Sequence, residues 1–392
     1  MGNPVKMAAI AASLVSTAAG GDPPVVTAVP AEAATMLGEK LENLGLLYRN
    51  ESDPVLQELW FLGRYHGQYH LAEGSNGRDE DWENRRFRIG GQARLLRNLT
   101  VHAQMVSGRE MDPIYNGFTE LWAGWRFSEA VTLTVGQQKH RFTHDRNVSS
   151  RYLNYFERGM LTNMFALDYT PGVTLSGKAG EWGYYAGVFS NATTSDKWSA
   201  FTELDSGWSF LASATLDLGQ AFGADTAHLN VGYVRSDANG NATNLNWFDN
   251  GVAAALILTE GPFSLVAEAT AGLGSVAGAN DFGINLQPTW FITDKLQLAT
   301  RYQLAVSDED NGLSAQRRYE RAAGMSTGDL YQAVYAGLNY HVAAHRIKLM
   351  SGMEYATLGG EDCWTVSVML RVFWGPHSKG PFPMAQMLKG TF

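Results

Sequence analysis

The feature that most constrains the fold is an alternation of apolar and polar residues that begins near residue 57 and continues to residue 374. In Trp364–Trp374, for example, every second residue is large and apolar, and the residues between are mostly small or polar. Side chains that alternate in this way lie on opposite faces of a β-strand. The pattern therefore predicts an all-β chain whose strands each have one apolar and one polar face.

Two further features favour a membrane barrel over a soluble sandwich. Tryptophans stand at strand ends on the apolar face, as in the aromatic girdles of membrane barrels; they are Trp208, Trp290, Trp364 and Trp374. Short connections also alternate with longer ones, which we place near 72–81, 107–117, 140–165, 190–206, 236–245, 274–281, 307–328 and 358–362. This rhythm is typical of barrels with short periplasmic turns and long outer loops. We predict a transmembrane up-and-down antiparallel β-barrel of about sixteen strands.

Composition narrows the alternatives. The chain has 392 residues, a formal net charge of −9, 18% charged residues and one cysteine. The acidic balance argues against a nucleic-acid partner, and a single cysteine excludes a disulfide scaffold. No recurring apolar run is long enough for several membrane helices. A barrel of about sixteen strands encloses a water-filled lumen that wall side chains cannot fill, so the fold implies a pore.

The two ends of the chain differ from the alternating region. Lys6 precedes an Ala-rich apolar run that ends in small residues, which predicts a secretory signal at 1–20. Leu37, Leu41, Leu44 and Tyr48 share one stripe and predict a short helix at 31–48. This helix either packs on its own protein or forms a small coiled coil that helps oligomerisation. The predicted order is signal 1–20, periplasmic linker and helix 21–56, barrel 57–374 and tail 375–392.

By alternation, several charged side chains face the lumen. The predicted cations are Arg64, Arg86, Arg88, Arg94, Arg126, Lys178, Arg301 and Arg371. Glu120, Glu268 and Glu354 share that face. The four cations of the first two strands could form a ladder along one wall. For each cation the sequence leaves two roles open: it guides ions, or it pairs with a carboxylate and braces the wall.

The longest connection is the candidate constriction, which we place at 139–165. Between Lys139 and Arg158 it has five cations against two carboxylates, and its many Tyr and Phe residues need a place to be buried. Folding into the lumen would bury them and narrow the pore, and a positive constriction favours anions. The candidate anion-binding residues are Lys139, His140, Arg141, His144, Arg146, Arg151 and Arg158. The alternative is a surface loop that is simply basic.

Three segments resemble the phosphate-selective porin O/P family: Glu83–Leu95, Leu133–Phe142 and Asn154–Leu161. The resemblance implies a sixteen-stranded homotrimeric porin of Gram-negative outer membranes, in which loop cations and an arginine ladder control anion passage. This sequence has Gln138 and Arg141 where the family usually has Phe and Pro. Of the lysine cluster typical of the most phosphate-selective members, only Lys139 is present.

The sequence thus predicts a porin for passive diffusion of small hydrophilic solutes, with a preference for small anions such as phosphate. It would contact outer-membrane lipid and lipopolysaccharide, need no cofactor and catalyse no reaction. Two alternatives remain open. One is a barrel hydrolase that uses Ser149 or Ser150 with His140 or His144. The other is a structural barrel tethered through the 31–48 helix.

Overall fold

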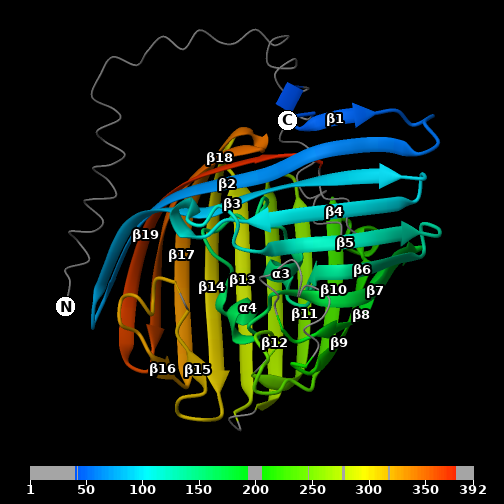
Figure 1. Ribbon diagram of the computed structural model, residues 1–392. Helices are drawn as coiled ribbons and strands as arrows, with labels where there is room; N and C mark the ends of the chain where they lie inside the picture. The colour runs from blue at the N-terminus through cyan, green and yellow to red at the C-terminus, as the bar shows by residue number, and fades with distance from the viewer. Residues whose placement is uncertain are drawn as a thin grey trace, which may run out of the picture.

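The computed structural model describes residues 40–41, 43–192, 205–245, 247–275, 279–316 and 318–376, and these form a closed barrel (Figure 1). The signal predicted at 1–20 lies outside the described residues, as does the predicted tail beyond Pro376. No helix among the described residues is long and apolar enough to cross a membrane. The architecture is therefore that of a β-sheet rolled on itself.

Sixteen antiparallel strands make the wall, and each pairs with its neighbours in the sequence. They are β2 (Leu56–Gly74), β3 (Arg78–Leu95), β4 (Leu99–Val106), β5 (Phe118–Arg126), β6 (Thr132–Lys139), β7 (Tyr169–Ala179), β8 (Trp182–Ser190), β9 (Trp208–Asp217), β10 (Thr226–Ser236), β11 (Phe248–Glu260), β12 (Phe263–Ser275), β13 (Asp281–Phe291), β14 (Leu296–Ser307), β17 (Leu330–His345), β18 (Ile347–Leu358) and β19 (Glu361–Trp374). Pairing of β19 with β2 from Cys363 to Trp374 closes the barrel. The predicted up-and-down barrel is confirmed.

The wall inverts the burial pattern of a soluble protein. Along β17 the outward residues Leu330, Val334 and Leu338 are exposed, whereas Tyr331 and Tyr335 face inward and are at most 2% exposed. An outer surface of apolar side chains suits contact with lipid, and closure leaves no unpaired sheet edge in the hydrocarbon. The alternation read from the sequence therefore has its apolar face outside.

Connections alternate in length along most of the barrel. The shorter set is 96–98, 127–131, 180–181, 218–225 with α5 (Gly219–Phe222), 261–262, 292–295 and residue 346. Two predicted long loops, at 72–81 and 358–362, are instead tight turns at 75–77 and 359–360. The first prediction was wrong because the charged residues after the turn belong to β3, where Asp79 and Glu80 bond to His70 and Tyr69 of β2. In the second turn, Gly359 and Gly360 adopt positive φ angles, which allow a two-residue reversal.

The helix predicted at 31–48 does not extend through Tyr48. Among the described residues of this segment only Lys40 and Leu41 are helical, and Leu46–Arg49 form the short strand β1. β1 pairs with residues 58–60 of β2, directly beyond the point where β19 ends at Gly63. Open hydrogen-bonding groups on the projecting end of β2 therefore favour a strand over the helical period of the sequence.

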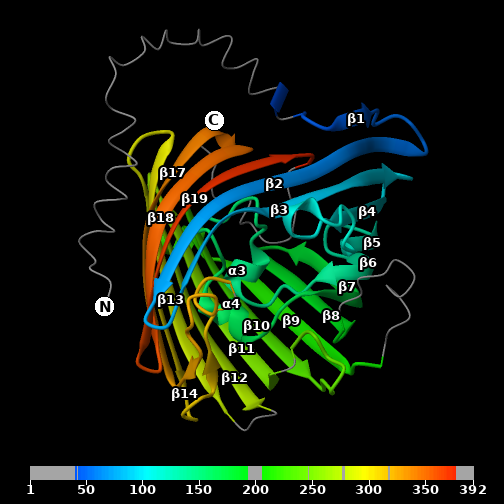
Figure 2. The same ribbon diagram turned by 60° about the vertical axis from the view of Figure 1, so that its left-hand side comes forward.

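Two long connections lie inside the barrel or across its mouth. The constriction loop, residues 140–168, contains α3 (His144–Asn147) and α4 (Met160–Met164), and both views show these helices within the barrel (Figures 1 and 2). The mouth loop, residues 308–329, contains the small β15–β16 hairpin (Leu313–Ser314 and Thr327–Gly328) at the end opposite to β1 (Figure 1). A one-turn helix η1 (Arg109–Met111) lies in the connection 107–117.

Candidate functional site

The constriction loop crosses the lumen and packs on the far wall. Phe142 lies against Gly232, and Leu161 lies against Gly283, where a Cβ atom would come within 2.1 Å of the leucine side chain. Tyr155 donates a hydrogen bond from its hydroxyl to the carbonyl oxygen of Thr300 at 2.9 Å. The apolar residues of the loop thus find their burial inside the barrel, on β10, β13 and β14.

Wall cations hold the backbone of this loop from below. The guanidinium of Arg371 donates to the carbonyl oxygens of Leu153, Tyr155 and Phe156 at 2.7, 2.6 and 2.9 Å. The ammonium of Lys348 donates to the carbonyl oxygen of Leu153 at 2.6 Å. Both cations are at most 1% exposed. Both side chains donate hydrogen bonds to the loop backbone, so they brace the loop against the wall.

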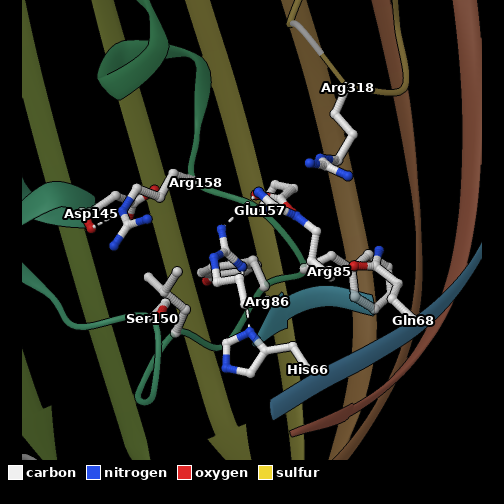
Figure 3. Close-up of polar contacts among 12 residues, drawn as sticks. His66, Gln68, Arg85, Arg86, Asp145, Ser150, Glu157, Arg158 and Arg318 are labelled. Atoms are coloured by element: carbon white, nitrogen blue, oxygen red, sulfur yellow. Dashed lines mark hydrogen bonds and ion pairs between the residues drawn. The ribbon is translucent and has the colours of Figure 1, made fainter. Parts of the chain in front are cut away.

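The carboxylate of Glu157, in the constriction loop, forms ion pairs with two adjacent arginines of β3 (Figure 3). Arg85 forms a two-pronged ion pair with it, and Arg86 reaches the same carboxylate at 3.1 Å while its other nitrogen lies 3.4 Å from Nδ1 of His66. Burial would raise the pKa of Glu157, but Arg85 and Arg86 outweigh burial and hold that pKa well below its ordinary value. The two arginines therefore favour the ionised form of Glu157.

Arg85 was not among the lumen residues predicted from the sequence. Simple alternation sends Arg85 and Arg86 to opposite faces. In the structure His66 pairs with Arg86 and the next residue, Gly67, pairs with Asn84, so Arg85 is an extra residue in a β-bulge. The bulge lets both guanidinium groups face the lumen. The adjacent arginines in the sequence were the only signal of it.

A second charge cluster ties the loop to the opposite wall. Arg301 lies 2.7 Å from Glu354, donates to the carbonyl oxygen of Glu157 at 3.0 Å and lies 3.8 Å from Asp145. Asp145 in turn accepts a hydrogen bond from the backbone of Gly159 at 2.7 Å. Arg301 and the Asp145 side chain are each 2% exposed. This cluster closes the loop on itself and fastens it to β14 and β18.

Three cations of the loop segment contact the loop itself. Lys139 donates to two backbone carbonyls of the constriction loop at 3.2 and 3.4 Å. Arg158 donates to the carbonyl oxygen of Asp145 at 2.8 Å. Arg146 lies 3.8 Å from Asp168 of the loop and 4.6 Å from the ring centre of Tyr169 at the start of β7. These contacts shape the constriction.

The two histidines of the loop add no positive charge at neutral pH. Burial lowers the pKa of His140 to about 3, with a smaller contribution from Arg146, and burial lowers the pKa of His144 to about 4. His140 lies 2.7 Å from the hydroxyl of Thr170. Ser150 accepts a hydrogen bond from Arg64 at 2.9 Å. The serines and histidines considered for a hydrolase thus have other neighbours.

Below the constriction loop, on the side of the short turns, lies a cavity of about 1040 Å³ that we call the vestibule. Its cations are Arg49, Arg64, Arg94, Arg97, Arg126, Lys139, Arg141, Arg151 and Lys178. Its carboxylates are Glu51, Glu58, Glu120 and Glu129, which leaves an excess of five positive charges. Two pairs neutralise one another, Arg49 with Glu58 and Arg94 with Glu51. Arg126 and Lys178 are exposed to the cavity.

Other residues predicted to face the lumen also form hydrogen bonds, either at the vestibule or nearer the constriction loop. Arg88 donates to the hydroxyl of Tyr169 at 3.0 Å. Glu268 accepts a hydrogen bond from the backbone of His144 at 2.6 Å. Four cations of β2 and β3 therefore do not form a free ladder, because each has a polar partner; they are Arg64, Arg86, Arg88 and Arg94.

The mouth loop narrows the outer end. Arg318 pairs with Glu83 of β3, and the hydroxyl of Tyr319 accepts a hydrogen bond from Gln68 at 2.6 Å. Asn163 of α4 donates to Gln316 at 2.7 Å, which joins the two inward-folded loops. The lumen is thus occupied by loops toward the outer end and open in the vestibule.

We expect the docking of the mouth loop to depend on pH through the buried carboxyl of Glu320. Glu320 is 4% exposed, and its carboxyl accepts hydrogen bonds from Gln316 and Tyr331. Burial, with a contribution from Glu354, raises its pKa from 4.5 to about 7. Since the docked pKa lies above the ordinary value, this stabilisation is complete below about pH 4.5 and is lost as pH rises through 7. We expect amide-exchange protection of residues 318–326, corrected for intrinsic rates, to fall at least about tenfold from pH 5 to pH 8.

The matched control for this pH dependence is Glu320→Gln, which stays neutral at both pH values. Protection in the Glu320→Gln protein should not differ between pH 5 and pH 8. Equal protection of the unaltered loop at the two pH values would show that Glu320 does not control its docking.

A family model described as phosphate-selective porin O and P matches residues 62–351. No curated protein sequence matches the chain significantly. Among solved structures, OprB of Pseudomonas putida is similar with a TM-score of 0.55 and 12% identity, over 81% of this chain and 94% of that one. The outer membrane channel DcaP of Acinetobacter baumannii is similar with a TM-score of 0.52 and 14% identity, over 84% of this chain and 100% of that one. The trimer form of OmpT, an outer membrane protein of Vibrio cholerae, is similar with a TM-score of 0.52 and 14% identity, over 81% of this chain and 99% of that one.

These likenesses agree with the fold, and the family model covers most of the barrel. The lumen, its inward loop and the open vestibule are the parts that a diffusion channel requires. The chain therefore belongs to the phosphate-selective porin O and P family and is a porin of the Gram-negative outer membrane, through which small hydrophilic solutes pass by diffusion.

Proposed function

We propose that this porin prefers anions and that the vestibule sets the preference. The observation that carries the proposal is the excess of five positive charges around a cavity of about 1040 Å³. Low-dielectric walls focus the field of such charges into the water between them. Anions concentrate there and cations are depleted, so the pore conducts anions better.

The cations proposed from the sequence separate into two groups by their contacts. Arg86, Arg301 and Arg371 are bound to carboxylates or loop carbonyls and act as braces. Arg126 and Lys178 line the vestibule near the short turns and are exposed there. We assign the guidance of ions to this second group, together with Arg141 at the edge of the constriction.

The sharpest test replaces cations that guide ions and touch no loop backbone. In Arg126→Gln/Lys178→Gln protein we expect the ratio of anion to cation permeability to fall by roughly threefold, because two charges leave a confined cavity. The ratio follows from reversal potentials of single channels in planar bilayers under KCl gradients.

Arg235→Gln is the control, since Arg235 lies on the outward face of β10 and its replacement removes a positive charge away from the vestibule. Its reversal potential should equal that of the unaltered protein. An unchanged potential in the double variant would refute the vestibule as the selective element. Neutralising Lys139, Arg141 and Arg146 would be a less clear test, because Lys139 also holds the loop backbone.

The assembly that suits this barrel is a homotrimer in contact with lipid and lipopolysaccharide. Support comes from the trimer form of the OmpT structure and from the exposed apolar belt, which includes Trp208 and Trp290 at 43% and 52% exposure. Phosphate and other small anions are the proposed solutes. We propose no covalent chemistry and no cofactor, in keeping with the family.

A further inference from the structure

The vestibule contains an aromatic platform that anion conduction does not require. On its wall Trp122 of β5 stacks on His102 of β4, with ring centroids 5.0 Å apart and planes 4° from parallel. Trp122 is partly exposed and lines the cavity. The next inward position on β5 is Gly124, which has no side chain to cover the indole. One face of the indole is thus stacked on His102, and the ring is partly exposed to a cationic cavity.

Three of the other aromatic rings that line the cavity are covered by cations. Arg49 lies 5.6 Å from the ring centre of Trp60, and Arg141 lies 5.7 Å from that of Tyr185. Tyr169 has Arg88 and Arg146 at 5.3 and 4.6 Å. The Trp122 ring is stacked instead on an imidazole, whose Nδ1 lies 3.1 Å from Gln92. Trp122 is thus the ring of this set that rests on a histidine and still faces the cavity.

Polar atoms beside the platform have unused hydrogen-bonding capacity. Nε of Arg64 and Nε2 of His102 are buried and have no hydrogen-bond partner among the described residues. The two side chains are 4% and 8% exposed, and both line the vestibule. Arg64 also reaches Gln104, two residues from His102 on the same strand face, at 3.1 Å. A nitrogen without a partner therefore lies in the imidazole on which Trp122 is stacked, and a second one lies in Arg64, which lines the same cavity.

We propose that the vestibule binds planar aromatic carboxylates, with the aromatic ring on Trp122 and the carboxylate toward the cations around Arg64. This inference rests on the proposed anion preference and names the substrate class. Aromatic pairs gain energy from offset stacking beyond burial alone, and guanidinium groups match carboxylates in geometry. A cavity of about 1040 Å³ has room for such an anion and for the water around it.

The test compares two anions of equal charge and similar size, benzoate and cyclohexanecarboxylate. Each is titrated against the KCl current of the full-length porin in planar bilayers, and the affinity follows from the block. We expect benzoate to bind about fivefold more tightly than cyclohexanecarboxylate. Simple hydrophobic contact would favour cyclohexanecarboxylate, so equal or reversed affinities would overturn the proposal without any variant.

Variants then locate the site. Trp122→Leu should abolish the difference between the two anions, and Trp122→Phe should keep most of it. Trp125→Leu is the matched control on the outward face of the same strand, where Trp125 is 36% exposed, and it should leave the difference intact. A difference that survives Trp122→Leu would place the aromatic site elsewhere and overturn the assignment.

The two proposals fail in different ways. If reversal potentials show anion preference but benzoate has no advantage, the aromatic site is refuted and the anion-selective vestibule stands. If reversal potentials show no anion preference, the proposed function is refuted. An advantage of benzoate that persists in Arg126→Gln/Lys178→Gln protein would show that the platform recognises the ring independently of those two charges.

Discussion

Replacing Glu157 by Gln is expected to lower the free energy of unfolding of the barrel by about 3 kcal/mol. The substitution leaves Arg85 and Arg86, which are 16% and 7% exposed, without their shared carboxylate. The two neighbouring guanidinium groups then repel each other, and no carboxylate offsets the free energy that their burial costs. Denaturant unfolding followed by tryptophan fluorescence, in lipid vesicles or detergent, measures the loss.

The control for this prediction is Glu80→Gln. Glu80 also pairs with an arginine, Arg78, but the two side chains are 41% and 58% exposed on the outer rim. Exposed pairs of this kind contribute little. The Glu80→Gln protein should unfold at the denaturant concentration of the unaltered protein, and the same result for Glu157→Gln would show that the Glu157 cluster does not stabilise the barrel.

Replacing Arg371 by Met is expected to release the constriction loop. Three backbone carbonyls lose a charged donor, and hydrogen bonds of this type contribute about 1.5–3 kcal/mol each. A combined loss of about 5 kcal/mol shifts the equilibrium between docked and released loop by more than about a thousandfold. Single-channel recordings should then show large current fluctuations that the unaltered porin lacks.

Arg126→Met tests whether these fluctuations come from the loop or from the loss of any lumen cation. Arg126 lies in the vestibule, so its replacement should lower anion preference without adding current noise. Quiet currents in Arg371→Met protein would contradict the bracing role. Equal noise in both variants would attribute the effect to charge rather than to the loop carbonyls.

Much of the wall could be predicted from the sequence. Apolar and polar residues alternate along each strand because one face contacts lipid and the other contacts water, and this pattern can be read locally. The faces of Leu330–His345 follow from period two alone. The ends of β2 and β3 could not be predicted, since the charged residues Arg78–Asp81 resemble a loop until their partners on β2 are known. The strand at Leu46–Arg49 was missed for a similar reason, because its partner is a projecting end of β2 that no local pattern reveals.

The site was less accessible to sequence reasoning. Net charge between Lys139 and Arg158 pointed to the constriction, and Tyr and Phe content pointed to its inward fold. Which cations face water and which bind carbonyls depends on contacts between residues far apart in the chain, as for Arg371 and Leu153. Burial of His140 and His144, which leaves both neutral, is likewise a product of tertiary packing.

The bulge at Arg85 has a consequence for how such channels acquire charge. An inserted residue in a regular strand would turn every later side chain to the wrong side, exchanging lipid contacts for water contacts along the rest of the strand. Here the insertion is absorbed within one ladder position, and the residues on either side keep their orientation. A single added codon can therefore place another cation in the channel while the membrane-facing surface stays as it was.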